Sequence, residues 1–233
     1  NVAQQFNIDR ADQDQFALAS QQRTATAQAQ GFFTHEIIPV NIPQRKGDPI
    51  VIDTDEHPRA STTLEGLARL KPVVTAEGTV TAGNASGIND GAAAVLIASE
   101  AAIEQYQLKP RAKIIASTAV GIEPRIMGFA PAPAIKKLLK QANLSIQQMD
   151  VIELNEAFAA QALAVTRDLG LADDTTQVNP NGGAIAIGHP LGASGARLVT
   201  TALNQLEQTG GTYALCSMCI GVGQGIAMII QRV

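Results

Sequence analysis

The sequence predicts an α/β protein in which helices cover the faces of a mostly parallel sheet. Beyond residue 110, short apolar runs typical of strands alternate with amphipathic segments of helical spacing. Glycine and proline stand near the boundaries of these segments, where they favour turns. The 233 residues are 45% hydrophobic and 16% charged, which is the composition of a globular chain long enough to bury a substantial core.

The first third of the chain looks like an insertion rather than a core. Residues 9–30 are expected to form a helix that Gly31 ends, and residues 61–70 a short helix that ends before Pro72. Several prolines predict an irregular, extended structure for the intervening residues 34–60.

The chain changes character at residue 78. Residues 78–87 are small and polar, and the apolar run that follows at 92–98 is a strand candidate. A helix is expected next, and it should end before Pro110.

The rest of the chain predicts strands and helices in alternation. The expected strands are residues 113–118, 151–154, 213–219 and 226–231. The expected helices are residues 133–143, 157–169 and 194–208. Glycine-rich residues 221–225 join the last two strands, which should form a closing hairpin.

Charge and composition exclude several classes of function. The net charge is −4 and no basic block is present, so we expect no nucleic-acid partner. No apolar run has the length of a bilayer span and no secretion signal is visible, so we expect no membrane partner. The two cysteines lie too close together for a disulfide framework, which favours a reducing, cytoplasmic setting.

Three stretches place reactive or small residues at strand ends, where α/β sheets build their sites. The first is NEAF at 155–158, directly after the strand at 151–154. Asn155 could simply cap the next helix, and this stretch by itself favours that interpretation. The alternative is that its amide points across the end of the sheet and holds a water molecule.

The second stretch, 181–197, surrounds His189 with five glycines and a proline. A lone histidine is more often structural than catalytic. Here the glycines should allow a ligand to approach the backbone closely, and an imidazole in such a place can exchange protons near neutral pH. We therefore favour a functional His189.

The third stretch begins with Cys219 at the end of a predicted strand, facing glycine amides. The thiol could be a base or nucleophile, or a buried inert cysteine. Cys216 and Cys219 also form a C-x-x-C pair, but in a regular strand they point to opposite faces. The position of the pair within a strand argues against a redox site, and the lack of further ligands at suitable spacing argues against a zinc site. No metal site is expected, and dinucleotide and phosphate-loop patterns are absent.

Together and in this order, the NEAF stretch, the GHP stretch around His189 and the Cys219-x-Gly221 stretch resemble the thiolase family. The similarity covers essentially the whole chain. It implies a thiolase-like layered αβαβα fold, here the C-terminal half plus part of the loop domain. The implied domains are residues 1–89, part of the loop domain; 90–109, the end of the N-terminal half; and 110–233, the C-terminal half.

The resemblance also implies catalytic roles. His189 would match the histidine that activates a nucleophilic cysteine and later holds the thioester oxygen. Asn155 would match the residue that fixes a water in the same oxyanion hole. Cys219 would match the second cysteine, which moves the α-proton or protonates the leaving enolate. The backbone N–H of Gly221 would match a donor to the second oxyanion hole.

Substrate-binding residues are implied in the same way. Ser86 and Gly87 would lie near the pantetheine arm of CoA, Met127 and Phe158 would form walls of the acyl pocket, and Arg59 would lie near the CoA nucleotide. Met127 would narrow the acyl pocket and favour short substrates. Acyl-CoA and CoA are the implied partners, CoA being a substrate, with no separate cofactor. The full-length enzyme is expected to be a homo-oligomer, a dimer or tetramer.

The chain departs from the family pattern in two places. Neither cysteine sits in the motif of the first, nucleophilic cysteine, so we expect the chain to be part of a longer enzyme and inactive alone. Val222 stands where the family commonly has a second glycine. The alternative hypothesis is a non-catalytic thiolase-like protein that binds CoA or lipid.

Overall fold

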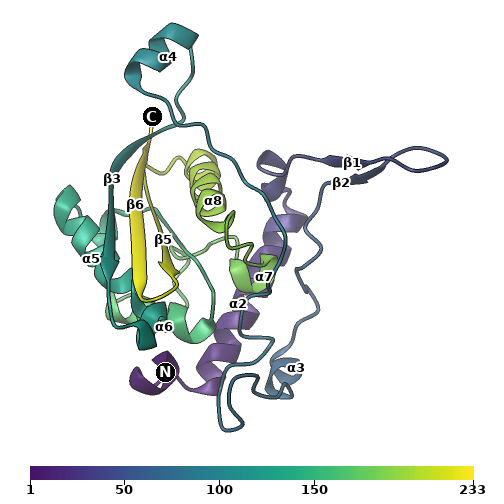
Figure 1. The fold of residues 1–233 in the computed structure, drawn as a ribbon, viewed down its shortest axis with the longest axis vertical. Helices are drawn as coiled ribbons and strands as arrows, with labels where there is room; N and C mark the ends of the chain where they lie inside the picture. Colours follow the sequence, from purple (N-terminus) through teal and green to yellow (C-terminus); the bar gives the residue numbers. More distant parts are fainter.

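The computed structural model describes residues 1–233 and contains one four-stranded sheet in the order β3-β6-β5-β4 (Figure 1). The strands are β3 Ala112–Gly121, β4 Val151–Leu154, β5 Tyr213–Ile220 and β6 Gln224–Arg232. All four were expected from the sequence. Only the β4–β5 pair is parallel, whereas β5–β6 and β3–β6 are antiparallel. The prediction of a mostly parallel sheet is therefore wrong, because the closing hairpin reverses β6 and β3 pairs with that reversed strand.

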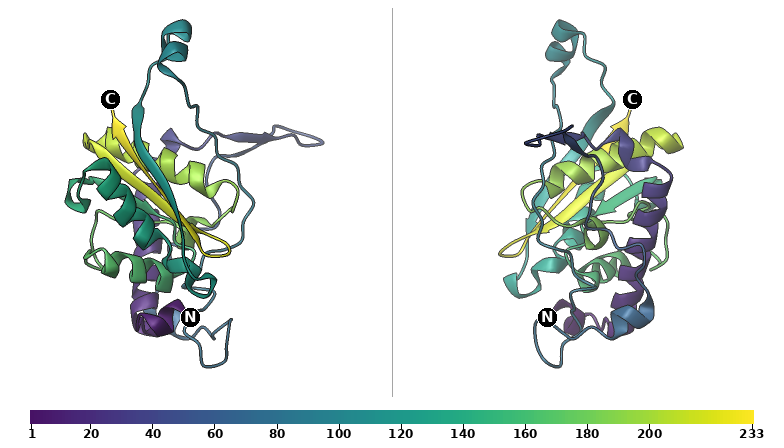
Figure 2. Two further views of the ribbon diagram at one scale, coloured as in Figure 1. Left: turned by 60° about the vertical axis from the view of Figure 1, so that its left-hand side comes forward. Right: turned by 90° about the vertical axis from the view of Figure 1, so that its right-hand side faces the viewer.

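Helices cover both faces of this sheet (Figure 2). Helices α5 Pro131–Ala142 and α6 Ala159–Asp168 pack on one face, and α8 Ser194–Thr209 packs on the other. Alternation along β5 sends Leu215 into the core beneath α5, and Ala214 and Cys216 into the core beneath α8. Cys219, three residues after Cys216, lies on the opposite face by the same alternation, and both thiols are free.

The helix boundaries follow local signals in the sequence. Two prolines occupy the first turn of α5, where a missing N–H is harmless, and Asn143 closes the helix in the left-handed conformation (φ 54°). Gly210, with φ 73°, ends α8 in the same way. The spacing of Ile135, Leu138 and Leu139 places all three in the core, as the apolar periodicity predicts.

The first third of the chain wraps one side of this core. Helix α2 Arg10–Ala29 runs beside α6 and the short α7 Ala184–Ile187, and Asp9 caps it by accepting from the N–H of Asp12. Around it lie α1 Val2–Gln5, the 3₁₀ helix η1 Phe32–His35 and α3 Leu64–Ala68. Residues 34–60 are not wholly irregular as expected, because β1 Val40–Ile42 and β2 Ile50–Ile52 form an antiparallel hairpin that projects from the body (Figure 1).

The apolar run at 92–98 does not form a strand. It is extended, and Val95, Leu96 and Ile97 are all exposed, Leu96 by 83%. The prediction of a strand there is wrong, because no neighbouring strand offers hydrogen bonds to this segment. Helix α4 Glu100–Tyr106 follows and stands away from the sheet (Figures 1 and 2).

Two short 3₁₀ helices complete the fold, η2 Pro124–Phe129 and η3 Ile146–Gln148. Helix η2 packs against α6. No helix combines the length and apolar character that crossing a bilayer requires.

Candidate active site

The candidate active site lies at the ends of β4 and β5, where segments distant in sequence meet. The backbone N–H of Asn155, directly after β4, donates to the carbonyl of Ser217 on β5 (3.0 Å). Asn155 is fully buried, and its Nδ2 lies 3.2 Å from Nε2 of His189. The capping interpretation of Asn155 is wrong, because α6 starts only after Phe158 and the Asn155 amide is turned toward His189.

His189 is held at both ends of its ring and through its backbone. Its Nδ1 lies 2.6 Å from Oγ of Ser194, and its backbone N–H donates to the carbonyl of Gly87 (3.1 Å). Burial lowers the pKa of His189, and the positive charge of Arg197 lowers this pKa further. The imidazole is therefore neutral at pH 7, the form that can accept a proton.

Glu156 fixes the loop that leads to His189. This carboxyl group is buried and accepts hydrogen bonds from Ser20 Oγ (2.6 Å), Asn179 Nδ2 (2.8 Å) and the backbone N–H of Ile185 (3.2 Å). Burial raises its pKa, and these hydrogen bonds oppose that rise. In the NEAF stretch, Asn155 thus contacts His189, and Glu156 holds the loop that leads to His189 in place.

Three of the five glycines around His189 leave room for other parts of the protein, whereas a Cβ at Gly192 would meet no atom within 4 Å. A Cβ at Gly183 would collide with the Glu156 carboxylate, and one at Gly188 (φ 92°) with the Asn89 side chain. A Cβ at Gly182 (φ 78°) would collide with helix α2. The absent side chains of these three glycines let α2 and two loops close around the site, and the approach of a ligand to the glycines of this stretch stays a prediction.

Cys219 and Gly221 lie at the open end of β5. Cys219 is buried, and burial raises the pKa of its thiol, so a thiolate there needs a partner to form. No hydrogen bond joins its Sγ to His189 or Asn155. The backbone N–H of Gly221 donates to no protein acceptor, and a Cβ there would meet no atom within 4 Å. The N–H of Gly221 is thus free to donate to a ligand.

Ser86, Gly87 and Phe158 lie side by side. The backbone N–H of Ser86 donates to the carbonyl of Ala157 (3.0 Å), and a Cβ on Gly87 would collide with the ring of His57. Phe158 is 39% exposed and pairs with the residue before Ser86. Through the bond from His189 to Gly87, this group adjoins the imidazole.

Met127 and Arg59 are less directly connected to the imidazole. Met127 lies in η2, and the next residue, Gly128, packs against Gln161 on α6, one turn after Phe158. Arg59 is exposed, its backbone N–H donates to Oε1 of Gln21 (2.7 Å), and its side chain forms no hydrogen bond or salt bridge within the chain. The substrate-binding roles of all five residues stay predictions.

Sequence reasoning missed three residues of this site. Ser194, beside the imidazole, was read only as the start of a helix. Glu153, which is fully buried, lies 3.2 Å from the partly buried guanidinium of Arg197 between β4 and α8, and burial raises the pKa of Glu153 to about 8 while Arg197 opposes the rise. An acidic residue inside the apolar strand at 151–154 was the signal that could have revealed this pair.

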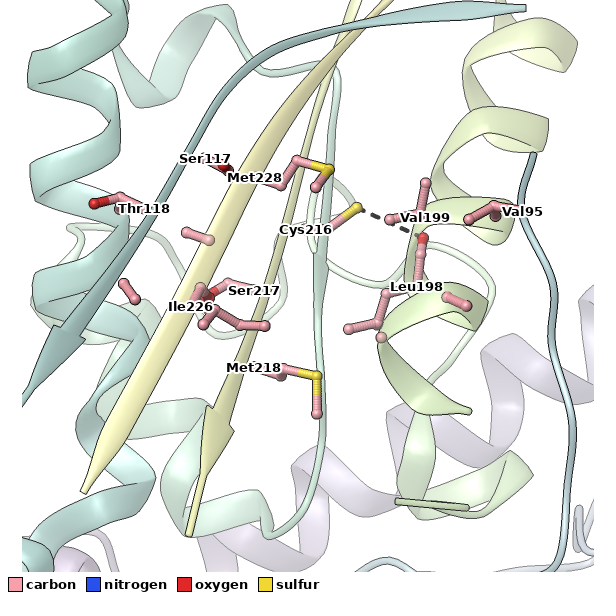
Figure 3. A pocket seen from close by; sticks show the side chains of 14 residues that line it. Val95, Ser117, Thr118, Leu198, Val199, Cys216, Ser217, Met218, Ile226 and Met228 are labelled. Atoms are coloured by element: carbon pink, nitrogen blue, oxygen red, sulfur yellow. Dashed lines mark hydrogen bonds between the residues drawn. The ribbon is translucent and has the colours of Figure 1, made fainter. Parts of the chain in front are cut away.

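An apolar cavity lies apart from this site. It measures about 560 Å³ and lies between α8 and the exposed face of β3, β5 and β6 (Figure 3). Mostly apolar side chains line it, including Leu198, Val199, Met218 and Met228, with Val95 of the extended segment at its edge. The thiol of Cys216 forms a weak hydrogen bond to the carbonyl of Leu198 (3.6 Å), and burial raises its pKa far above the usual range. The thiol therefore stays protonated and unreactive. No group of three or more His, Cys, Asp or Glu side chains that could hold a metal ion is present.

The fold and site together define an α/β protein that sets a neutral imidazole, a carboxamide and a thiol at adjoining strand ends. Models of a known protein family match the sequence of this chain. A sequence model described as the N-terminal domain of thiolase matches residues 1–101, and one described as the C-terminal domain of thiolase matches residues 108–232. The chain belongs to the thiolase family, as its motifs predict.

Individual relatives and structures support this assignment. The chain is 84% identical over its whole length to a beta-ketoadipyl-CoA thiolase of Acinetobacter baylyi and 61% identical to one of Pseudomonas aeruginosa, and it spans 58% of the length of each. The crystal structure of the Bacillus anthracis acetyl-CoA acetyltransferase matches the whole chain with a TM-score of 0.95 at 42% identity, over 58% of that structure. Human mitochondrial 3-ketoacyl-CoA thiolase in complex with CoA matches the whole chain with a TM-score of 0.90 at 44% identity, over 57% of that structure. The thiolase-like fold expected from the motifs is therefore confirmed.

Proposed function

We propose that this chain is part of a thiolase that cleaves beta-ketoadipyl-CoA with CoA. The observation that carries the chemistry is the buried contact between Asn155 and the neutral imidazole of His189 at the meeting point of the three motifs. The names of the two relatives given above support the substrate. This proposal refines the expectation of short substrates to a six-carbon acyl group that ends in a carboxylate.

His189 acts first in this mechanism. Its Nε2 takes the proton from a cysteine thiol that lies outside these 233 residues, and the thiolate attacks the keto carbon of the substrate. The new Nε2–H then donates to the thioester oxygen of the acyl-enzyme. The buried Oδ1 of Asn155 has no protein partner, which suits its proposed task of holding a water in the same oxyanion hole.

Cys219 and Gly221 act on the departing acetyl group. When the bond between the α and keto carbons breaks, the electron pair leaves with acetyl-CoA as an enolate, and the Cys219 thiol protonates its carbon. The free N–H of Gly221 donates to the enolate oxygen, where negative charge develops. The Cys219 thiolate takes the proton of the incoming CoA thiol, and the resulting CoA thiolate attacks the acyl-cysteine and releases the shortened acyl-CoA. The regenerated cysteine thiolate then takes back the proton held by His189. The raised pKa of Cys219 keeps its proton available for the transfer to the enolate.

The proposed substrate contacts surround this centre. Ser86 and Gly87 border the pantetheine arm, Met127 and Phe158 the acyl group, and the free side chain of Arg59 reaches the nucleotide end of CoA. We also propose that the apolar face around the 560 Å³ cavity is covered by the part of the protein outside these residues, and that the complete enzyme is a homo-oligomer.

The test is a thiolysis assay on the complete protein and on the 233-residue chain alone. With beta-ketoadipyl-CoA and CoA, the complete protein should yield acetyl-CoA and succinyl-CoA, and the isolated chain should yield neither. Acetoacetyl-CoA should be a poorer substrate. If the complete protein cleaves no 3-ketoacyl-CoA yet binds CoA, it is instead a non-catalytic thiolase-like protein.

A further inference from the structure

We propose that Ser194 is a positioning residue that holds His189 in the tautomer with the proton on Nδ1, leaving Nε2 unprotonated and able to accept a proton. The positioning role builds on the proposed function of His189 as the base. Ser194 is 1% exposed and opens helix α8, so its hydroxyl has a fixed place beside the ring. Its Oγ lies 2.6 Å from Nδ1 of His189 and 3.0 Å from the carbonyl oxygen of Pro190.

The carbonyl of Pro190 can accept a hydrogen bond from the hydroxyl of Ser194, which directs the hydroxyl proton away from the ring of His189. This oxygen can only accept, and a hydroxyl at the first turn of a helix commonly bonds a carbonyl four residues earlier. When the Ser194 hydroxyl donates to Pro190, its oxygen is left to accept from Nδ1–H of His189. Serine thereby fixes which ring nitrogen carries the proton.

The opposite face of the ring points to the same assignment. Nδ2 of Asn155 lies 3.2 Å from Nε2 and can donate one of its two N–H groups to the lone pair of this nitrogen, which leaves Oδ1 and the second N–H of Asn155 without a protein partner. In the other tautomer Nε2–H would have to donate to the Asn155 oxygen. The two N–H groups of the buried amide would then have no protein acceptor. Orphaned buried donors are rarer than orphaned acceptors, so the Nδ1–H tautomer, which orphans one N–H group instead of two, is favoured.

This arrangement matters because only Nε2 faces Asn155 and the reacting groups. A base must present its lone pair to the proton that it removes. If His189 carried its proton on Nε2, it could not deprotonate the nucleophile from that side. The Nδ1–H···Oγ bond persists when Nε2 becomes protonated, so Ser194 supports the imidazole in both halves of the reaction.

The first experiment is nuclear magnetic resonance of the protein labelled with ¹⁵N-histidine, at a pH where the ring is neutral. The ¹⁵N shifts distinguish the protonated from the unprotonated ring nitrogen, and a His189→Asn variant identifies the signals. We expect Nδ1 of His189 to be protonated in the wild type. A wild-type ring protonated on Nε2 would overturn the proposal, independently of any result on activity.

Variants then test whether Ser194 is the cause. Ser194→Ala should shift His189 toward the Nε2–H tautomer and lower kcat about 10- to 100-fold in the complete enzyme, the range seen when an orienting partner of a functional histidine is removed. KM should change little. Ser194→Thr, which keeps the hydroxyl, should retain the wild-type tautomer. An unchanged tautomer in a folded Ser194→Ala protein would overturn the role of Ser194.

Thr200→Val is the matched control. Thr200 lies on the same helix, and its hydroxyl bonds the carbonyl of Ala196 (3.0 Å), four residues earlier, as that of Ser194 bonds Pro190. It contacts no imidazole, so its loss should leave both the tautomer and kcat unchanged. An equal fall of kcat in both variants, without a change of tautomer, would reduce Ser194 to a structural residue of the helix.

Discussion

Two apolar runs of similar character differ in burial and in strand pairing. Residues Val151–Leu154 form β4, and every side chain of that strand is buried. Residues 92–98 are also apolar and extended, yet Leu96 is 83% exposed and Ile97 70% exposed. The first run lies between β5 and a bridge to Val178, whereas the second has no strand beside it.

The contrast separates the propensity to extend from the ability to pair. An apolar run predicts extended backbone, but a strand is stable only when a neighbour satisfies its N–H and C=O groups. The region after residue 110 supplies its own neighbours and a core on both faces of the sheet. The region before it has no such sheet of its own, and its helix α2 packs against α6 and α7 of the later region. The site follows the same division, because His189, Asn155 and Cys219 all lie after residue 110.

The largest expected effect is on catalytic activity, and it distinguishes the region after residue 110 from the region before it. In the complete enzyme, His189→Asn should lower kcat about 10²- to 10⁴-fold, because it removes the general base. Arg59→Ala, in the region before residue 110, should raise KM by about fivefold or less, since an exposed charge contributes little to binding. Steady-state kinetics measure both constants. A larger loss of kcat for Arg59→Ala would place that arginine in the chemistry and blur the division.

Stability should separate the regions in the 233-residue chain. Leu215→Ala should lower the free energy of unfolding by about 2–5 kcal/mol, because Leu215 is fully buried under α5. Leu96→Ala should change the free energy of unfolding by about 0.5 kcal/mol or less, because its side chain is exposed. Urea unfolding followed by circular dichroism measures both. Similar losses for the two variants would mean that residues 92–98 are packed in solution.

The burial of Glu153 beside Arg197 predicts a pH dependence of stability. The pKa of Glu153 is raised from 4.5 to about 8 in the folded state, so between these pH values the folded protein keeps a proton that the unfolded chain releases. Stability from this group is present below pH 4.5 and is lost as the pH rises toward 8. Relative to Glu153→Gln, wild type should therefore become less stable from pH 5 to pH 8.

Urea unfolding at several pH values tests this dependence. Glu207→Gln is the control, because the pKa of Glu207 is lowered by Arg111 and its contribution changes only below pH 4.5. Parallel stability curves for wild type and Glu153→Gln from pH 5 to pH 8 would show that Glu153 is ionised throughout.

The smallest effect concerns the turn after Cys219. Val222 is held at φ 63°, a left-handed conformation that a β-branched residue rarely adopts. Val222→Gly should therefore raise the free energy of unfolding by about 1 kcal/mol. Val222→Ala should gain little, because its Cβ meets the same backbone. Thermal unfolding compares the three proteins, and a loss of stability on Val222→Gly would argue against strain at this turn.

Much of the fold beyond residue 110 was determined by the sequence itself. Proline, glycine and asparagine mark the ends of α5 and α8, and apolar spacing marks their buried faces, because these signals act over only a few residues. The same holds for the family, since its three motifs are short and continuous. The residues at the centre of the site, His189 and Asn155, could therefore be named before the structure.

Only the tertiary structure decided the direction of strand pairing, the exposure of residues 92–98 and the destination of the Asn155 amide. Each depends on contacts between residues far apart in the chain, which local patterns do not encode. Ser194 is the clearest case. Its hydroxyl looks like an ordinary helix-opening group in the sequence, and it acquires a role only because the fold places the ring of His189 2.6 Å away.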